Sequence, residues 1–256
     1  RRIVHCWTTS RSEHKEKLKK GFVSETDFYS YCARKIRDLM KLFPCIHIAL
    51  DAQGGGIAVM ESLHDKDKIQ EGELPIWPTI DDKKEKDTDG ESGLHILEMC
   101  QFAKYDWLSE ANHGLRKDFE DKVLLFPFFD AVSLDISEHQ DTMKSRMFDT
   151  LEECVLDIEE LKDELAMIQM TATASGRDRW DTPQVVVGTG KKSKMRKDRY
   201  SSLLMANMAA RGLQRTPEQA AYDFYGGFAT GGHKPKSTDK LYTGPSWFAD
   251  NMKDVY

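Results

Sequence analysis

Two acidic residues, Asp51 and Asp198, occupy positions from which a carboxylate could bind a metal ion. Asp51 follows the mostly apolar run of residues 45–50 and precedes three glycines at 54–56. An apolar run bounded by turn residues is typical of a buried strand. A charge at the end of such a strand needs a partner, and carboxylates suit Mg²⁺ and Mn²⁺. The glycines favour a tight turn and the close approach of a ligand. The alternative is a strand-to-helix turn in which Asp51 caps the next helix.

The second acid lies in a strongly basic segment, GTGKKSKMRKDRY, at residues 188–200. Asp198 is its only acid, and six cations accompany it: Lys191, Lys192, Lys194, Arg196, Lys197 and Arg199. A dense cationic loop favours polyanions through counterion release, so we predict that these six residues bind DNA. The alternatives are a solvated loop and a helix N-cap at Asp198.

Together the two acids predict a catalytic metal centre. Two or three converging carboxylates hold two metal ions about 4 Å apart, which activate water and stabilise the leaving oxygen in phosphodiester cleavage. We therefore expect Asp51 and Asp198 to approach each other across the end of a sheet. Both would be catalytic and metal-binding, with Mg²⁺ or Mn²⁺ in a two-metal site.

The composition of the chain limits the classes of protein to which it can belong. The chain has 256 residues and a formal net charge of −6, which argues against a wholly basic nucleic-acid coat but allows a local basic groove. No run is apolar and long enough to cross a bilayer, and residues 1–7 lack the apolar core of a signal peptide. The first residue is not Met, and we expect the chain to be part of a longer polypeptide. The five cysteines have no CxxC spacing, so we expect buried free thiols rather than a zinc or redox site.

Hydrophobic periodicity predicts alternating strands and helices, and therefore an α/β fold. Strands are expected at residues 2–9, 45–51, 74–77, 123–126 and 185–187. Helices are expected at residues 28–43, 57–63, 94–120, 147–168 and 200–211. Residues 11–20 are expected to form a charged connection, and residues 81–90 a solvated loop. On the helix at 147–168, four acids are expected to face water: Glu159, Glu160, Asp163 and Glu164.

The last 45 residues differ in composition from the rest of the chain. Residues 212–256 mix Gly, Pro, Lys and aromatic residues without a helical or strand period. Such a segment is a poor core-former and is typical of one that orders on a partner. We therefore expect a docking segment; the alternative is that Trp247 and Phe248 fold back to cover the sheet.

The order of several segments resembles the large terminase subunits of tailed double-stranded DNA bacteriophages. ARKIRDL and IHIALDAQGGG match a helix that leads into a strand ending in an acid and a glycine turn. EAN, VLLFP and LKDEL resemble later landmarks, and KDRYSSLL resembles the family's final acid-bearing helix. The resemblance extends from about residue 2 to residue 211.

This resemblance implies that residues 1–211 form an RNase H-like nuclease domain, a mixed central sheet flanked by helices. The family cuts concatemeric viral DNA before and after packaging, through a metal-bound acidic cluster. By motif, Asp51 matches the second acid of that cluster and Asp198 the last. The family's first acid lies upstream of everything in this chain, since residues 2–9 look like a later strand and residues 3–7 contain no carboxylate.

The resemblance also implies partners and a location. The packaging ATPase is expected upstream of this chain, because no GxxxxGK[ST] loop occurs in it. The other expected partners are viral double-stranded DNA, the small terminase subunit and the portal protein, which the tail at 212–256 would contact. The place of action would be the host cytoplasm, at the procapsid.

Three functions fit these observations. The first is a Mg²⁺- or Mn²⁺-dependent endonuclease domain of a packaging motor. The second is a noncatalytic DNA-binding and docking module with an incomplete RNase H-like metal site, which the missing first acid favours. The third, a resolvase-like nuclease of the same fold, fits the later segments less well.

Overall fold

The computed structural model describes residues 1–79, 92–129, 132, 135–136, 150–173, 176–187 and 191–214, with backbone only at 185–187, 191–194 and 214. By their contacts these residues form two compact units. One, here called the sheet unit, holds residues 9–107 and continues from 209. The other, the helical unit, holds residues 1–8 and 108–208. Each unit is described by itself.

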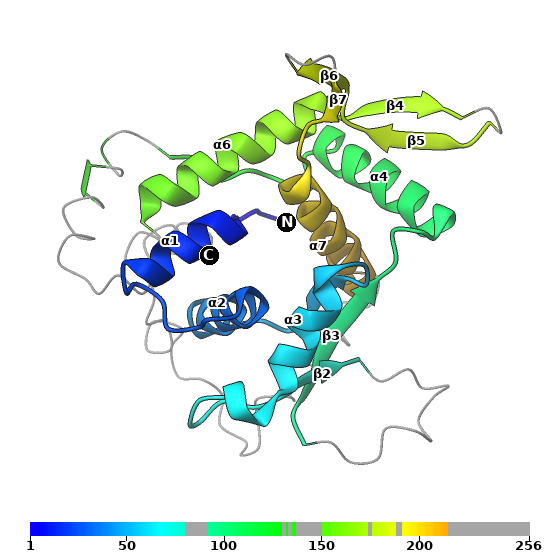
Figure 1. The fold of residues 1–256 in the computed structure, drawn as a ribbon. Helices are drawn as coiled ribbons and strands as arrows, with labels where there is room; N and C mark the ends of the chain where they lie inside the picture. Colours follow the sequence, from blue (N-terminus) through cyan, green and yellow to red (C-terminus); the bar gives the residue numbers. More distant parts are fainter. Residues whose placement is uncertain are drawn as a thin grey trace. The chain divides into compact units, whose positions relative to one another are not determined.

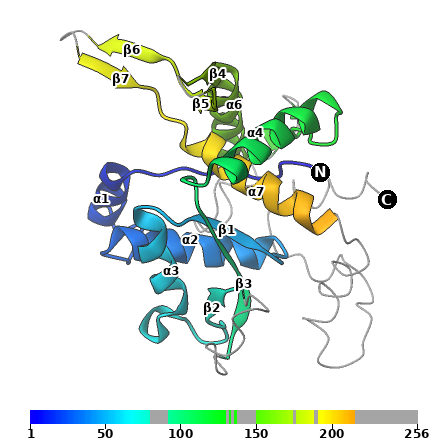
Figure 2. The ribbon, with the colours of Figure 1, turned by 90° about the vertical axis from the view of Figure 1, so that its right-hand side faces the viewer.

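The sheet unit is built on three parallel strands in the order β1-β3-β2. Figure 1 labels β2 and β3, and Figure 2 labels all three strands. They are β1 (Ile48–Asp51), β2 (Ile76–Pro78) and β3 (Leu94–Cys100). The central strand β3 pairs with β1 in unbroken register, from Ile48 opposite Leu97 to Asp51 opposite Cys100. The chain is therefore a mixed α/β protein with a small parallel sheet flanked by helices, as the alternating pattern predicted.

Three α-helices and a short 3₁₀ helix complete the sheet unit: α1 (Arg11–Lys19), α2 (Phe28–Leu42), α3 (Gly55–His64) and η1 (Lys66–Lys68). Asp27 caps α2 by accepting the backbone N–H of Ser30, at 2.8 Å. The apolar stripe of α2 packs with α3 and the sheet around buried Ala33, Val59, Leu63, Ile76 and Leu97. Burial of this shared face is what joins the sheet to its helices.

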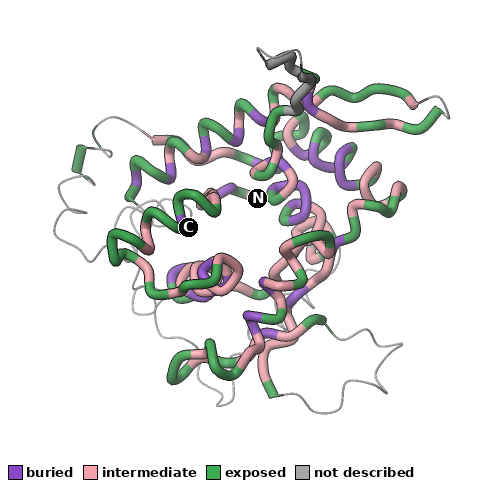
Figure 3. The backbone as a smooth tube through the Cα atoms, in the orientation of Figure 1, coloured by how far each residue is buried: buried purple, intermediate pink, exposed green. Residues whose placement is uncertain are grey.

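The helical unit contains most of α4 (Tyr105–Glu120), α6 (Leu151–Met167) and most of α7 (Asp198–Gln214). Two antiparallel hairpins accompany them: β4 (Gln169–Ala172) with β5 (Asp178–Asp181), and β6 (Gln184–Val187) with β7 (Lys191–Lys194). Figure 3 shows buried positions recurring along α6, which correspond to Leu151, Cys154, Ile158 and Leu161. This spacing of three and four residues is that of one helix face.

Several predicted elements differ from the structure. The helix predicted at 94–120 is wrong over its first part, because Leu94–Cys100 is the central strand β3. Residues 11–20 are mostly the helix α1, which begins with a capping box between Ser10 and Glu13. The strands expected at 2–9 and 123–126 reduce to a single parallel bridge between Arg2 and Leu125.

Other expectations fall partly outside the described residues. The loop at 81–90 lies outside them, and so does the tail after Gln214. The basic segment was expected to be a loop, but its residues 191–194 form strand β7. The five cysteines are free thiols, as predicted, but only Cys100 and Cys154 are buried, whereas buried thiols were expected throughout. No helix in the described part of the chain is long and apolar enough to cross a membrane.

Candidate functional site

Asp51 is the last residue of β1, at the carboxyl end of the parallel sheet. Its Oδ1 accepts the backbone N–H of Gln53 at 2.9 Å, which is the hydrogen bond of an Asx turn. The following helix α3 has Gly54 as its N-cap and no side-chain cap bond. Asp51 therefore shapes the turn that leaves the strand, and the alternative in which it caps α3 is wrong.

Each of the three glycines meets a different steric requirement of this turn. Gly54 has φ 60° and ψ −120°, a conformation that L side chains rarely adopt. A Cβ on Gly55 would lie 2.5 Å from Cε1 of Tyr29, and one on Gly56 would lie 1.8 Å from the carbonyl oxygen of Asp51. The packing of the chain itself therefore favours small residues in this turn. The close approach of a ligand to the glycines remains a prediction.

A second acid, Glu98, lies on the same face of the sheet as Asp51. Asp51 lies opposite Cys100, and Ala49 lies opposite Glu98. Because every second residue of a strand points to the same face, these four side chains share one face of the sheet. The two carboxylates act on a common neighbour, since burial first, then Glu98 and Asp51, raise the pKa of Cys100 to about 12. Sequence reasoning missed this pair of acids, because residues 94–100 were predicted to be helical.

Glu98 already has a partner within the sheet unit. Its Oε2 lies 2.9 Å from Nε2 of His47. This hydrogen bond, with the charge of His47, lowers the pKa of Glu98 despite burial. The face therefore carries two acidic side chains, Asp51 and Glu98, and the imidazole of His47 holds the second.

Asp198 is the first residue of α7, two residues before the helix start expected at residue 200, and its side chain is 62% exposed. Its Oδ2 lies 2.9 Å from Nη2 of Arg196, which is also exposed. An ion pair between two exposed side chains orients them only weakly. The position of this carboxylate therefore depends on how the first turn of α7 is fixed.

The six predicted DNA-binding cations fall into two groups. Lys191, Lys192 and Lys194 lie on β7, where the structure describes the backbone alone. The other three each have a carboxylate partner: Arg196 with Asp198, Lys197 with Asp181, and Arg199 with acids of α6. Of the four α6 acids expected to face water, Glu164 is buried, so that expectation was wrong for it. Glu159, Glu160 and Asp163 are exposed, as predicted.

The metal centre itself stays a prediction. Asp51 belongs to the sheet unit and Asp198 to the helical unit, so their expected convergence is not decided. Both offer hard carboxylate oxygens, which fit Mg²⁺ and Mn²⁺. Within the residues that the structure describes, no group of three or more His, Cys, Asp and Glu side chains is placed to hold one metal ion.

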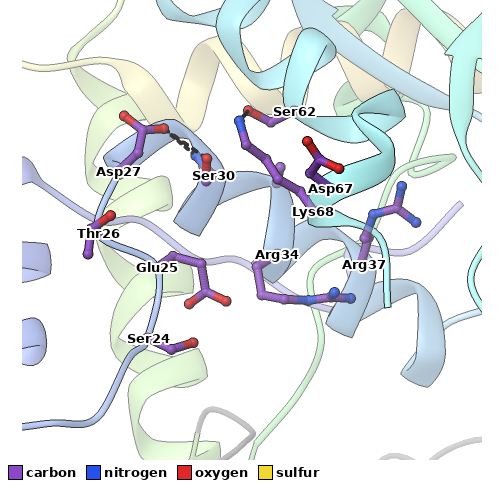
Figure 4. Close-up of a pocket in the computed structure, with 11 residues that line it drawn as sticks. Ser24, Glu25, Thr26, Asp27, Ser30, Arg34, Arg37, Ser62, Asp67 and Lys68 are labelled. Carbon is purple, nitrogen blue, oxygen red and sulfur yellow. Dashed lines mark hydrogen bonds between the residues drawn. The ribbon is translucent and has the colours of Figure 1, made fainter. Parts of the chain in front are cut away.

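The sheet unit also contains a polar cavity of about 430 Å³ between the start of α2 and the segment around η1 (Figure 4). Its three cations already have partners within the unit. Arg37 donates to the carbonyl oxygens of Leu63 and Leu74, and Arg34 donates to Glu73. Lys68 donates to Ser62, at 3.3 Å. Neither Asp51 nor Asp198 lines this cavity.

No protein-family model matches this chain, and no curated protein or solved structure matches it. The resemblance to large terminase subunits therefore rests on the sequence segments alone.

Proposed function

We propose that this chain is the metal-dependent endonuclease domain of a phage DNA-packaging terminase. Its substrate would be concatemeric viral double-stranded DNA, cut at the start and the end of packaging. The observation that carries the proposal is the place of Asp51, at the carboxyl end of a strand in a parallel sheet with helices beside it. Ligands of open α/β sheets bind at that end of the strands.

The proposal includes the finer fold, an RNase H-like domain over residues 1–211 that takes in both units. Asp51 and Asp198 would hold Mg²⁺ or Mn²⁺ ions, which activate water and stabilise the leaving oxygen. The Asx turn fixes one oxygen of Asp51 and so limits the directions in which the carboxylate can bind. A third carboxylate would match the family's first acid, which residues 3–7 do not supply.

The DNA would lie along the β6–β7 hairpin, whose second strand carries three lysines. A two-stranded ribbon fits the major groove, and lysines neutralise phosphates without reading sequence. We therefore expect cleavage without sequence preference. The small terminase subunit, the portal protein and the packaging ATPase are the proposed partners, and the proposed place of action is the host cytoplasm at the procapsid.

Plasmid cleavage by wild type and Asp51→Asn, with Mg²⁺, Mn²⁺ or EDTA, tests the proposal. Asparagine keeps an oxygen for the Gln53 N–H, so the turn and the fold should survive. Because a metal ion supplies several kcal/mol of transition-state stabilisation, we expect the rate to fall about 100-fold or more. Asp163→Asn is the matched control, since it removes an exposed carboxylate from α6. Wild-type rates in EDTA, or in Asp51→Asn, would refute metal catalysis.

The second candidate is a noncatalytic DNA-binding and docking module. The specific observation in its favour is that residues 3–7 contain no carboxylate to serve as the first acid. This candidate predicts DNA binding with no cleavage in any metal, and no effect of Asp51→Asn on that binding. The same set of measurements therefore separates the two functions.

A further inference from the structure

The two basic neighbours of Asp198 are each attached to a different element of the helical unit. Lys197 contacts β5, where its Nζ lies 3.1 Å from Oδ1 of Asp181 and donates to the carbonyl oxygen of Trp180 at 3.3 Å. Arg199 contacts α6 instead. The exposed carboxylate of Asp198 thus sits between two anchored residues.

Arg199 makes the denser set of contacts, and its side chain is only 14% exposed. Nε and Nη2 donate to Oδ1 of Asp157 at 3.1 and 2.7 Å, and Nη1 donates to Oε1 of Glu164 at 3.2 Å. Nη2 also pairs with Glu160. Charge-assisted hydrogen bonds of this kind are the strong ones, and the planar guanidinium makes several at once. A DNA phosphate could reach Arg199 only by displacing these carboxylates.

Glu164 also acts directly on α7. While Oε1 accepts from Arg199, Oε2 accepts the backbone N–H of Tyr200, at 2.9 Å. This N–H belongs to the first turn of α7, where backbone donors lack partners within the helix. A buried carboxylate of α6 therefore caps the helix that Asp198 begins, with the charge that a helix N-terminus favours. The Tyr200 hydroxyl adds a buried hydrogen bond to Asn112 of α4.

We propose that Lys197 and Arg199 are positioning residues that hold Asp198 for metal binding, and that they are not phosphate contacts. This inference rests on the proposed nuclease function. The two residues fix the backbone on either side of Asp198. Its carboxylate can therefore be exposed to solvent while its Cα keeps a fixed position. Supporting groups of this kind orient metal ligands, and their loss lowers metal affinity.

Arg199→Lys in the full chain is the first test, because lysine keeps the charge and loses the multiple hydrogen bonds. Arg116→Lys, at an exposed arginine paired with Glu120, is the matched control. We expect Mn²⁺ affinity, measured by calorimetry, to fall about tenfold or more. Hydrogen exchange at the Tyr200 amide should become faster. The slope of log affinity for DNA against log salt should remain that of wild type.

A slope that falls by about one unit, with Mn²⁺ affinity and amide exchange unchanged, would make Arg199 a phosphate contact and overturn the proposal. Unchanged values in all three measurements would overturn it as well. If Arg199→Lys does not fold, Lys197→Met is measured in the same way, since Lys197 is 36% exposed and less tied to the core. If wild type neither binds Mn²⁺ nor cleaves DNA, the nuclease function fails. Amide exchange and the salt slope then decide whether Arg199 fixes the start of α7 or contacts a phosphate.

Discussion

Glu73 connects α2 to the segment before β2, and its replacement by glutamine should destabilise the sheet unit. Its side chain is 12% exposed and faces three cations of α2. It accepts from Arg34, lies 3.0 Å from Nζ of Lys41 and 3.7 Å from Nη1 of Arg37. It also accepts the backbone N–H of Gln70, at 3.2 Å. Glutamine fits the same space but cannot balance three positive charges.

The magnitude follows from the pKa of Glu73. Burial opposes its ionisation, but hydrogen bonds from Arg34 and Lys41 outweigh this and lower the pKa from 4.5 to about 2. Since one pKa unit is worth about 1.4 kcal/mol, the ionised carboxylate adds roughly 3 kcal/mol to the free energy of unfolding at neutral pH. The folded-state pKa is the lower one, so this stabilisation is complete above about pH 5 and is lost as the pH falls toward 2.

Urea unfolding of wild type and Glu73→Gln at two pH values measures this contribution. We expect wild type to be more stable by about 3 kcal/mol at pH 7 and by about half of that at pH 3. Glu71→Gln, at an exposed acid two residues away, is the control and should change stability by less than about 0.5 kcal/mol. Equal stability of Glu73→Gln and wild type at pH 7, or a difference that does not depend on pH, would refute the reasoning.

Three further predictions concern the turn, the hairpin and the tail. Gly56→Ala places a Cβ 1.8 Å from the Asp51 carbonyl oxygen and should cost about 2–3 kcal/mol in urea unfolding, whereas Gly212→Ala, with open space around it, should be neutral or stabilising. Replacing the three lysines of β7 by alanine should reduce the salt slope of DNA binding by up to about three units; an unchanged slope would mean that DNA binds elsewhere. Deletion after Arg215 should abolish portal association but not cleavage, and a melting temperature lowered by many degrees would assign the tail to the core.

The sequence was sufficient to predict elements whose apolar residues share one face. The helices α2, α6 and α7 were predicted because their apolar residues recur every three or four positions, and β1 because it is a short apolar run next to turn residues. Strand β3 was missed because LHILEMC has no regular alternation and contains good helix formers. Its strand conformation follows from pairing with two other strands, which is a tertiary effect.

The candidate site likewise has features that are local in sequence and features that depend on tertiary structure. The position of Asp51 at a strand end is local in sequence and was predicted correctly. Glu98 on the same face depends on the register of two strands about fifty residues apart, which no local pattern reveals. The limited space at position 55 depends on the ring of Tyr29, a residue of another helix.

Charge counting was least informative for the basic segment, because it treats six cations as equivalent. In the structure Arg199 pairs with three acids of α6, and Lys197 pairs with Asp181 of β5. Arg196 is exposed beside Asp198. A cation already paired with carboxylates of its own fold contributes little to counterion release, since it has little free charge to offer a phosphate. Substitutions at Lys197 and Arg199 should therefore change the position of Asp198. Substitutions of the lysines on β7 should instead change the affinity for DNA. The two effects can be separated by salt dependence even though the residues are close in sequence.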